Sequence, residues 1–157
     1  MRVVELRTEE GKSIAHARMA HTFSARWLGL FNETELAARE GLLLIPGRSV
    51  HTAGLRQAID VVFMDRQLRV VRLLPNLLPW RFALAPHETR IVLELRAGRI
   101  AEVGLALNAN VYACFDDDES EEIVPGIRTR ICNSAVRPRP SSTCIRFSLR
   151  LPLERKP

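Results

Sequence analysis

The sequence lacks a long apolar run. None of its 157 residues lies in a stretch that approaches the roughly 20 apolar residues of a membrane-spanning helix. The opening segment, MRVVELRTEEGKSIA, has no apolar core of signal-peptide length. We therefore expect a cytoplasmic protein without a transmembrane segment. With 46% hydrophobic and 26% charged residues, the composition is that of an ordinary globular chain that is long enough to bury a core.

Cysteine and lysine are both scarce. The three cysteines, Cys114, Cys132 and Cys144, lack the close spacing of zinc motifs, and an odd number leaves one of them unpaired in any intramolecular disulfide scheme. We expect reduced structural thiols. Of 23 basic residues only two are lysines, so the chain is arginine-rich. Nucleotide composition explains this bias at least as well as phosphate recognition does.

The charged residues divide the chain near residue 115. Residues 116–122 contain six acidic residues, and residues 123–157 contain eight basic residues and one acidic residue. A block of like charge repels itself, and the proline- and serine-containing stretch that follows favours extended chain without a packed face. We predict one compact β-rich domain over residues 1–115 and a partly disordered tail over 116–157, in which Ile145–Leu153 alternates enough for an edge strand.

Short runs of alternating or continuous apolar residues predict a mostly β protein of the α+β class. The chain contains no internal repeat. We expect short helices over Thr22–Trp27, from Asn32 or Thr34 to Arg39, and over Arg99–Leu105, because caps and glycines bound these segments. The expected strands are Val3–Arg7, Ser13–His21, Leu42–Ile45, Ile59–Asp65, Leu68–Leu74, Trp80–Leu84, Thr89–Leu95 and Val111–Phe115.

The segment from His51 to Asp65, HTAGLRQAIDVVFMD, resembles the central motif of the bacterial and archaeal family catalogued as domain of unknown function 192. Further segments agree with the family in the expected order, and together the resemblance covers about residues 13–115. These segments are Arg26–Leu30 (RWLGL) with Gly41–Leu44, Pro79–Arg81 (PWR), and Leu93–Leu95 (LEL) with Ala97-Gly98.

The chain departs from the family pattern in two places. Gln57-Ala58 stands where relatives carry an aromatic residue and a proline, and Asn108–Asn110 stands where they end on a Pro-Gly-Asp turn. The resemblance implies a small barrel-like antiparallel or mixed sheet with two or three short helices. It implies no activity, because the family as a whole has none established.

Asp60 is the most informative single residue of the motif. Its neighbours on the same strand face, Val62 and Met64, are apolar, so an ionised carboxylate there requires a partner. By their place in the motifs, Arg56 and Arg81 are the candidate partners, because a planar guanidinium suits a bidentate pair with a carboxylate. Asp60 is then either a structural ion pair that pins the hairpin or the orienter of a ligand-binding arginine, and the structural role is favoured.

The leading functional hypothesis is a non-enzymatic accessory module. Its rim, built from His51, Arg56, Trp80 and Arg81, would hold a small polar or anionic ligand or a protein partner. For Trp80 itself, a lid over the open end of the barrel is favoured over contact with a ligand. The hypothesis rests on motif residues that converge without a recognisable nucleophile or metal set.

Two alternatives stay open. One is a small hydrolase with His51 as general base, Asp60 as orienter and Ser49 as nucleophile, although no Gly-x-Ser-x-Gly motif is present. The other is nucleic acid or an anionic surface bound through the basic tail. The chain contains no Walker loop, dinucleotide fingerprint or His-Glu-x-x-His, so we predict no cofactor and no metal site.

Overall fold

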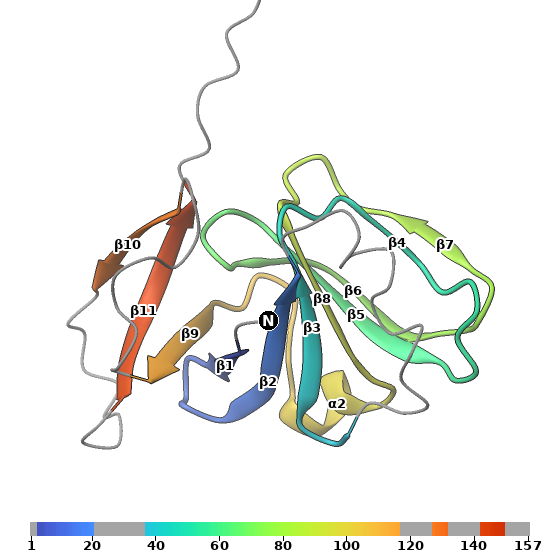
Figure 1. The fold of residues 1–157 in the computed structure, drawn as a ribbon, viewed down its shortest axis with the longest axis horizontal. Coiled ribbons are helices and arrows are strands. Elements are labelled where there is room, and N and C mark those ends of the chain that lie inside the picture. The colour runs from blue at the N-terminus through green and yellow to red at the C-terminus, as the bar shows by residue number, and fades with distance from the viewer. Residues whose placement is uncertain (1–2, 21–36, 117–126, 132–141, 150–157) are drawn as a thin grey trace, which may run out of the picture.

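Nine strands form one sheet in the order β10-β11-β9-β1-β2-β3-β8-β5-β6, and β4 and β7 form a separate two-stranded ribbon (Figure 1). The computed structural model describes residues 3–20, 37–116, 127–131 and 142–149. The strands are β1 (Val3–Thr8), β2 (Ser13–Ala20), β3 (Glu40–Leu44), β4 (Ser49–His51), β5 (Ile59–Met64), β6 (Val70–Leu77), β7 (Phe82–Leu84), β8 (Ile91–Arg96), β9 (Val111–Asp116), β10 (Ile127–Ile131) and β11 (Ser142–Leu149).

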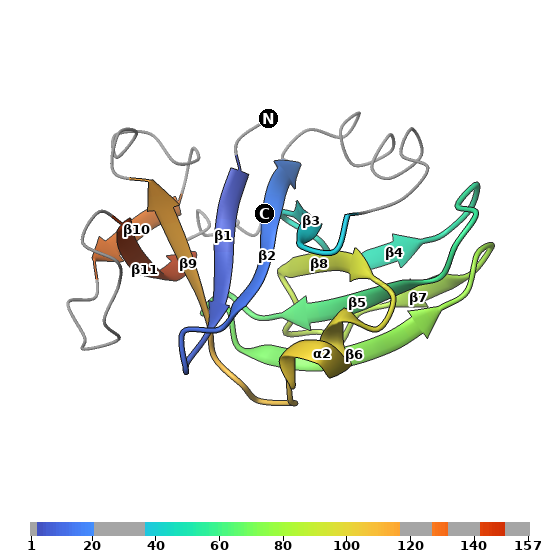
Figure 2. The same cartoon turned by 90° about the horizontal axis from the view of Figure 1, so that it is seen from below.

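The large sheet is mixed and strongly curled. Strands β2 and β3 run parallel, and every other neighbouring pair is antiparallel. Figure 2 shows β1 and β2 crossing the direction of β5 and β6, as in a half-barrel. Main-chain hydrogen bonds join the start of β6 to the start of β9: Val111 N–H donates to Leu68 O at 3.0 Å, and Val70 N–H donates to Ala109 O at 2.9 Å. The predicted mostly β, barrel-like mixed sheet is confirmed.

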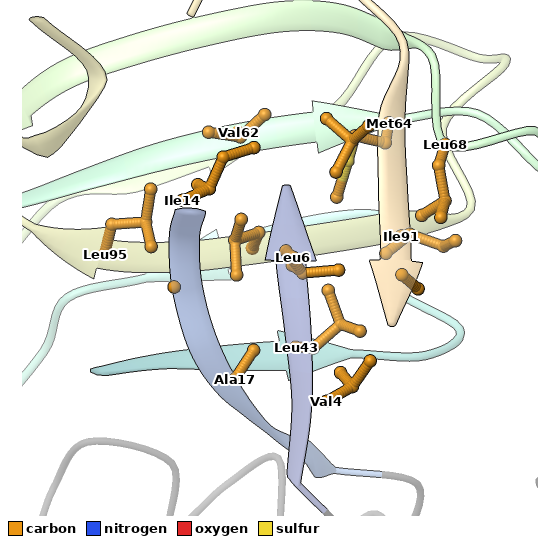
Figure 3. Close-up of a cluster of buried hydrophobic side chains, with 14 of the residues drawn as sticks. Val4, Leu6, Ile14, Ala17, Leu43, Val62, Met64, Leu68, Ile91 and Leu95 are labelled. Carbon is orange, nitrogen blue, oxygen red and sulfur yellow. The ribbon is translucent and has the colours of Figure 1, made fainter. Parts of the chain in front are cut away.

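The concave side of the sheet holds the main hydrophobic core. Leucine, isoleucine, valine and methionine side chains from both halves of the sheet meet there (Figure 3). The short helix adds Ile100 and Val103 to the same core. Alternation along each strand directs every second side chain into this core. The fully buried members include Leu6, Ile14, Leu43, Met64 and Leu95.

A second, smaller apolar cluster lies on the opposite face of the sheet, which we call the outer face. It contains Leu42, Val61, Phe63 and Val92 from the strands, together with Val50 from the ribbon. All six residues of β5 are buried, as expected for a strand covered on both sides. The outer cluster therefore fixes the ribbon to the sheet.

One helix, α2 (Arg99–Val103), is present in the described part of the chain. It lies between Gly98 and Gly104, both in the left-handed conformation, which glycine adopts at little cost. The helix expected over Arg99–Leu105 is confirmed. The helix expected over Thr22–Trp27 lies outside the described residues, and residues 37–39, the end of the other expected helix, begin a turn. Two or three helices are therefore not confirmed.

The cysteine prediction is wrong at one position. Cys114 in β9 is disulfide-bonded rather than reduced. Strand β11 pairs with β9 so that residue 144 lies opposite residue 114, and β10 pairs with β11 at the edge of the sheet. Two segments of the predicted tail thus extend the sheet. Residues 117–126, 132–141 and 150–157 lie outside the described residues.

Candidate functional site

Thr52 joins two segments of the predicted rim that lie far apart in the sequence. Its side chain is fully buried. Its N–H donates to Arg81 O at 2.9 Å, and its hydroxyl oxygen accepts from Arg81 N–H at 2.8 Å. The same hydroxyl donates to Leu78 O at 2.7 Å, and Thr52 O accepts from Trp80 N–H at 3.0 Å. Residue 52 therefore fixes the corner at residues 78–81 beside the end of β4.

The backbone of Trp80 adopts a left-handed conformation, with φ of +60°. Such a conformation is uncommon for a bulky residue and persists only where the surroundings hold it. Here the hydrogen bonds of Thr52 to both Trp80 and Arg81 supply that restraint. The indole that this corner presents is 71% exposed. Trp80 thus occupies a strained backbone position without burying its side chain.

The ribbon has one buried face and one exposed face. Val50 belongs to the outer cluster, and its partner Ala83 packs against that cluster. On the other face His51 pairs with Phe82, and Ser49 pairs with Leu84. The large apolar side chains exposed along this face and the adjoining corner are Leu78, Trp80, Phe82 and Leu84, with exposures of 56%, 71%, 64% and 64%. We call these four residues the ribbon stripe.

Arginines flank the ribbon stripe. Arg81 follows Trp80 directly, and Arg56 lies on the loop that continues from residue 52; both are exposed. Arg48 precedes β4 and is also exposed, and its carbonyl accepts from Ala85 N–H at 3.0 Å. Of the predicted rim residues, the structure brings His51, Trp80 and Arg81 together at the corner that Thr52 holds, and Arg56 lies four residues along the same loop.

The hydrogen-bond partners of Asp60 differ from those that the motif suggested. Its carboxylate is fully buried and accepts two main-chain hydrogen bonds, from Asn76 N–H at 2.9 Å and from Ile100 N–H at 2.8 Å. The expected partners were the guanidinium groups of Arg56 and Arg81. Asp60 instead ties the β5–β6 hairpin to the start of α2. One oxygen satisfies the buried N–H of Ile100, and the other satisfies the N–H of Asn76, an exposed residue of β6.

The residues of the hydrolase alternative lie apart. Ser49 and His51 are exposed on β4, whereas Asp60 is buried with both carboxylate oxygens engaged by main-chain N–H groups. A catalytic base needs an orienting group within hydrogen-bond reach, and Asp60 does not provide one to His51. Within residues 3–20, 37–116, 127–131 and 142–149, no group of three or more potential metal ligands occurs.

Two features of this region were missed in the sequence. Thr52 was passed over because a single threonine after a strand carries no pattern, and its partners are main-chain atoms. The ribbon stripe had a signal, since Leu78, Trp80, Phe82 and Leu84 recur at every second residue. The stretch from Trp80 to Leu84 was interpreted only as a strand. Within the observed strand, the same period places Phe82 and Leu84 on one face.

Comparison with solved structures supports the fold. A protein of unknown function from Novosphingobium aromaticivorans superimposes with a TM-score of 0.61 at 23% identity, over 69% of this chain and 82% of that chain. A protein from Sinorhizobium meliloti, described as a "putative transcription regulator", superimposes with a TM-score of 0.62 at 21% identity, over 69% of this chain and 90% of that chain. At these identities the likeness concerns the fold.

Comparison by sequence identifies the family. No curated protein matches the chain. Within the described part of the chain, no helix is long and apolar enough to cross a membrane. The family model for DUF192, described as "Uncharacterized ACR", matches residues 4–112, which include the ribbon, Asp60 and the corner held by Thr52. The chain therefore belongs to the DUF192 family.

Proposed function

We propose that this chain is a non-enzymatic binding module, and that its ribbon stripe binds a peptide segment of a protein partner. The segment would carry apolar side chains and carboxylates. The observation that carries the proposal is the set of hydrogen bonds from Thr52, because they hold Trp80, a member of the stripe, in a strained and exposed position. Strain that the fold maintains at an exposed residue favours a role in recognition over one in packing.

The apolar character of the stripe supports a protein partner. Scattered exposed apolar residues are ordinary, but a contiguous group rimmed by polar residues marks an interaction site. Leu78, Trp80, Phe82 and Leu84 are each more than half exposed; Phe82 and Leu84 lie on one face of the ribbon, and Leu78 and Trp80 lie on the adjoining corner. Tryptophan is among the side chains that contribute most to binding at protein interfaces. The stripe therefore offers an anchor and a row of apolar contacts.

The charges beside the ribbon stripe favour a peptide that carries carboxylates. Arg48, Arg56 and Arg81 are exposed around it, and a guanidinium binds carboxylates through paired hydrogen bonds. A peptide that alternates apolar and acidic residues matches both features. A small polar or anionic ligand is the other occupant of such a rim. Small ligands are usually held in enclosed sites, and the 71% exposure of Trp80 favours the peptide.

A peptide selection tests this function. The full chain is used to select binders from a displayed library of random peptides, and recovered peptides are assayed by fluorescence anisotropy. We expect sequences enriched in aspartate or glutamate next to aromatic or branched apolar residues. Binding should weaken as salt is added, because exposed charge pairs are screened.

Variants locate the site. Trp80→Ser and Arg81→Glu should each abolish binding of the selected peptides. The matched control is Leu107→Ser, which removes an apolar side chain of similar exposure, 57%, outside the ribbon. The control should bind as the wild-type chain does. A selection without enrichment, or equal losses in Trp80→Ser and Leu107→Ser, contradicts the proposal.

A further inference from the structure

The ribbon stripe is bordered by positive charge alone. Residues 48–56 and 78–85, which form the ribbon and the loops beside it, contain three arginines and no acidic residue. The arginines are Arg48, Arg56 and Arg81, and all three are exposed. Their guanidinium groups form no ion pair with any residue of the described part of the chain. The surface around the stripe therefore offers its cations to an external carboxylate.

The chain itself contains a segment with the complementary composition. Residues 117–124, DDESEEIV, carry five carboxylates, and the run ends on the branched apolar residues Ile123 and Val124. We call residues 117–124 the acidic segment. A peptide that binds the ribbon stripe needs the same two features, carboxylates for the arginines and apolar side chains for the stripe. The acidic segment is therefore a candidate occupant of the ribbon stripe.

The two strands that flank the acidic segment lie far from the ribbon. Strand β9 ends at Asp116 and β10 begins at Ile127, and both belong to the end of the sheet opposite to β5 and β6. Figures 1 and 2 both show β9 and β10 on one side of the molecule and the ribbon on the other. Fully extended, the chain from Asp116 to Ile127 is at most about 40 Å long, and because it must return to β10 it reaches out by no more than about half of that length. This arrangement favours contact between two copies of the chain over contact within one copy.

Like charges oppose a symmetric contact between two ribbons. Such a contact would bring the three arginines beside one stripe against the same three arginines of the other copy, and like charges that meet across an interface oppose association. A head-to-tail contact, in which the ribbon of one copy meets the acidic segment of another, pairs these arginines with carboxylates instead. A contact of this kind joins two different surfaces, so it can continue from one copy to the next.

We propose that the chain associates with itself head to tail, through the acidic segment of one copy and the ribbon stripe of the next. The guanidinium groups of Arg48, Arg56 and Arg81 bind carboxylates of the acidic segment, and Trp80 contacts its apolar end, Ile123 and Val124. This inference rests on the proposed function and names the partner of the same surface as a second copy of this chain.

Light scattering after size-exclusion chromatography measures the association of the full chain. At low salt the wild-type mass should rise with concentration above the 17.8 kDa of one chain. It should return to that value at about 1 M salt, where charges are screened beyond about 3 Å. Electrophoresis without reductant excludes dimers that are linked through a cysteine.

Two variants each remove one side of the contact. The stripe variant carries Trp80→Ser and Arg81→Glu. The amide variant carries asparagine or glutamine at the five acidic positions of the acidic segment and keeps the ribbon unchanged. Each should be monomeric alone, and an equimolar mixture should form a one-to-one complex with twice the 17.8 kDa mass of one chain. The matched control, Glu9→Gln with Glu10→Gln, removes exposed carboxylates outside the acidic segment and should associate as the wild type does.

Three results would overturn the inference: a wild-type chain that stays monomeric at low salt, an amide variant that associates as the wild type does, or a mixture of the two variants that stays monomeric. Thermal melting checks that both variants are folded, which is expected because neither changes a buried side chain. Failure of this inference is distinguishable from failure of the proposed function. A monomeric wild-type chain that still binds a selected peptide through Trp80 and Arg81 overturns the self-association alone.

Discussion

At the scale of single residues, Asp60 and Glu94 show how surroundings decide the role of a buried carboxyl group. Asp60 meets two main-chain N–H groups, and its role is structural. Glu94 meets apolar side chains, and burial raises its pKa. The sequence predicted that Asp60 needs a partner, because its strand neighbours are apolar. It could not predict which partner, because every residue except proline has a main-chain N–H and the sequence does not show which of them lies near Asp60.

Asp60→Ala should destabilise the fold by about 3 kcal/mol, since it leaves the buried N–H of Ile100 and the N–H of Asn76 without their acceptors. Urea denaturation measures this free energy. Glu88→Ala, a change at an exposed carboxylate, should stay within about 0.5 kcal/mol of wild type. Equal stability of the two variants would show that the pair of hydrogen bonds from Asp60 does not stabilise the fold.

The pH dependence of stability reports on Glu94. Unfolded, this group ionises with a pKa of 4.5, and folded it ionises at about 8. Between these values the folded chain keeps a proton that the unfolded chain has released, so stability falls as pH rises, by up to roughly 1.4 kcal/mol per pH unit. Below pH 4.5 and above pH 8, Glu94 does not change the slope of stability against pH.

Glu94→Gln should remove that slope. Wild type and variant are compared by urea denaturation across the range from pH 4.5 to 8, and the difference in unfolding free energy should grow in favour of the variant as pH rises. The lowered pKa values of Glu5 and Glu102 add slopes of the opposite sign below about pH 4.5, outside this range, and both proteins share them. Parallel profiles would mean that Glu94 titrates normally.

At the scale of elements, period-two alternation located most strands, while the short strand β4 and the long-range partners escaped prediction. The β5–β6 hairpin followed from two apolar runs separated by Arg66-Gln67. Strand β4 has only three residues, too few to show a period. The joining of its end to residues 78–81 depends on Thr52, whose contacts span 26 to 29 positions. Local pattern carries no information on such pairings.

Thr52 and Thr89 are both fully buried, and substituting each of them by valine tests the role of the Thr52 hydroxyl. Thr52→Val should destabilise the fold by about 1 to 3 kcal/mol, because Arg81 N–H and Leu78 O lose their partner. The hydroxyl of Thr89 is also buried but has no hydrogen-bond partner, so Thr89→Val should be neutral or stabilising. Thermal or urea denaturation compares the pair. A loss in Thr89→Val equal to that in Thr52→Val would contradict the assigned hydrogen bonds.

At the scale of the whole molecule, different parts of the chain form the two ends of the large sheet. Strands β10 and β11 extend one end beyond β9, and β5 and β6, close to the ribbon, form the other. The acidic stretch over residues 116–122 and the basic stretch that follows it were visible in the sequence. The pairing of β11 with β9 and the disulfide at Cys114 were not, because strand pairing across a long loop has no local signature.

Alkylation without reduction tests the disulfide. A peptide map of the unreduced chain should recover Cys114 unalkylated, and the same peptide should be alkylated after reduction. One of the three cysteines should react freely in both samples. Disulfides persist mainly in oxidising compartments, so this result would argue against the expected cytoplasmic location. Full alkylation of Cys114 before reduction would restore the sequence-based expectation of reduced thiols.

The ribbon stripe as a binding surface is the central claim, and hydrogen exchange of the full chain with and without a selected peptide tests it most directly. We predict slower exchange over residues 48–52 and 78–85 when the peptide is bound, and unchanged exchange over residues 104–110 around Leu107. Protection that leaves residues 78–85 unchanged would contradict the account.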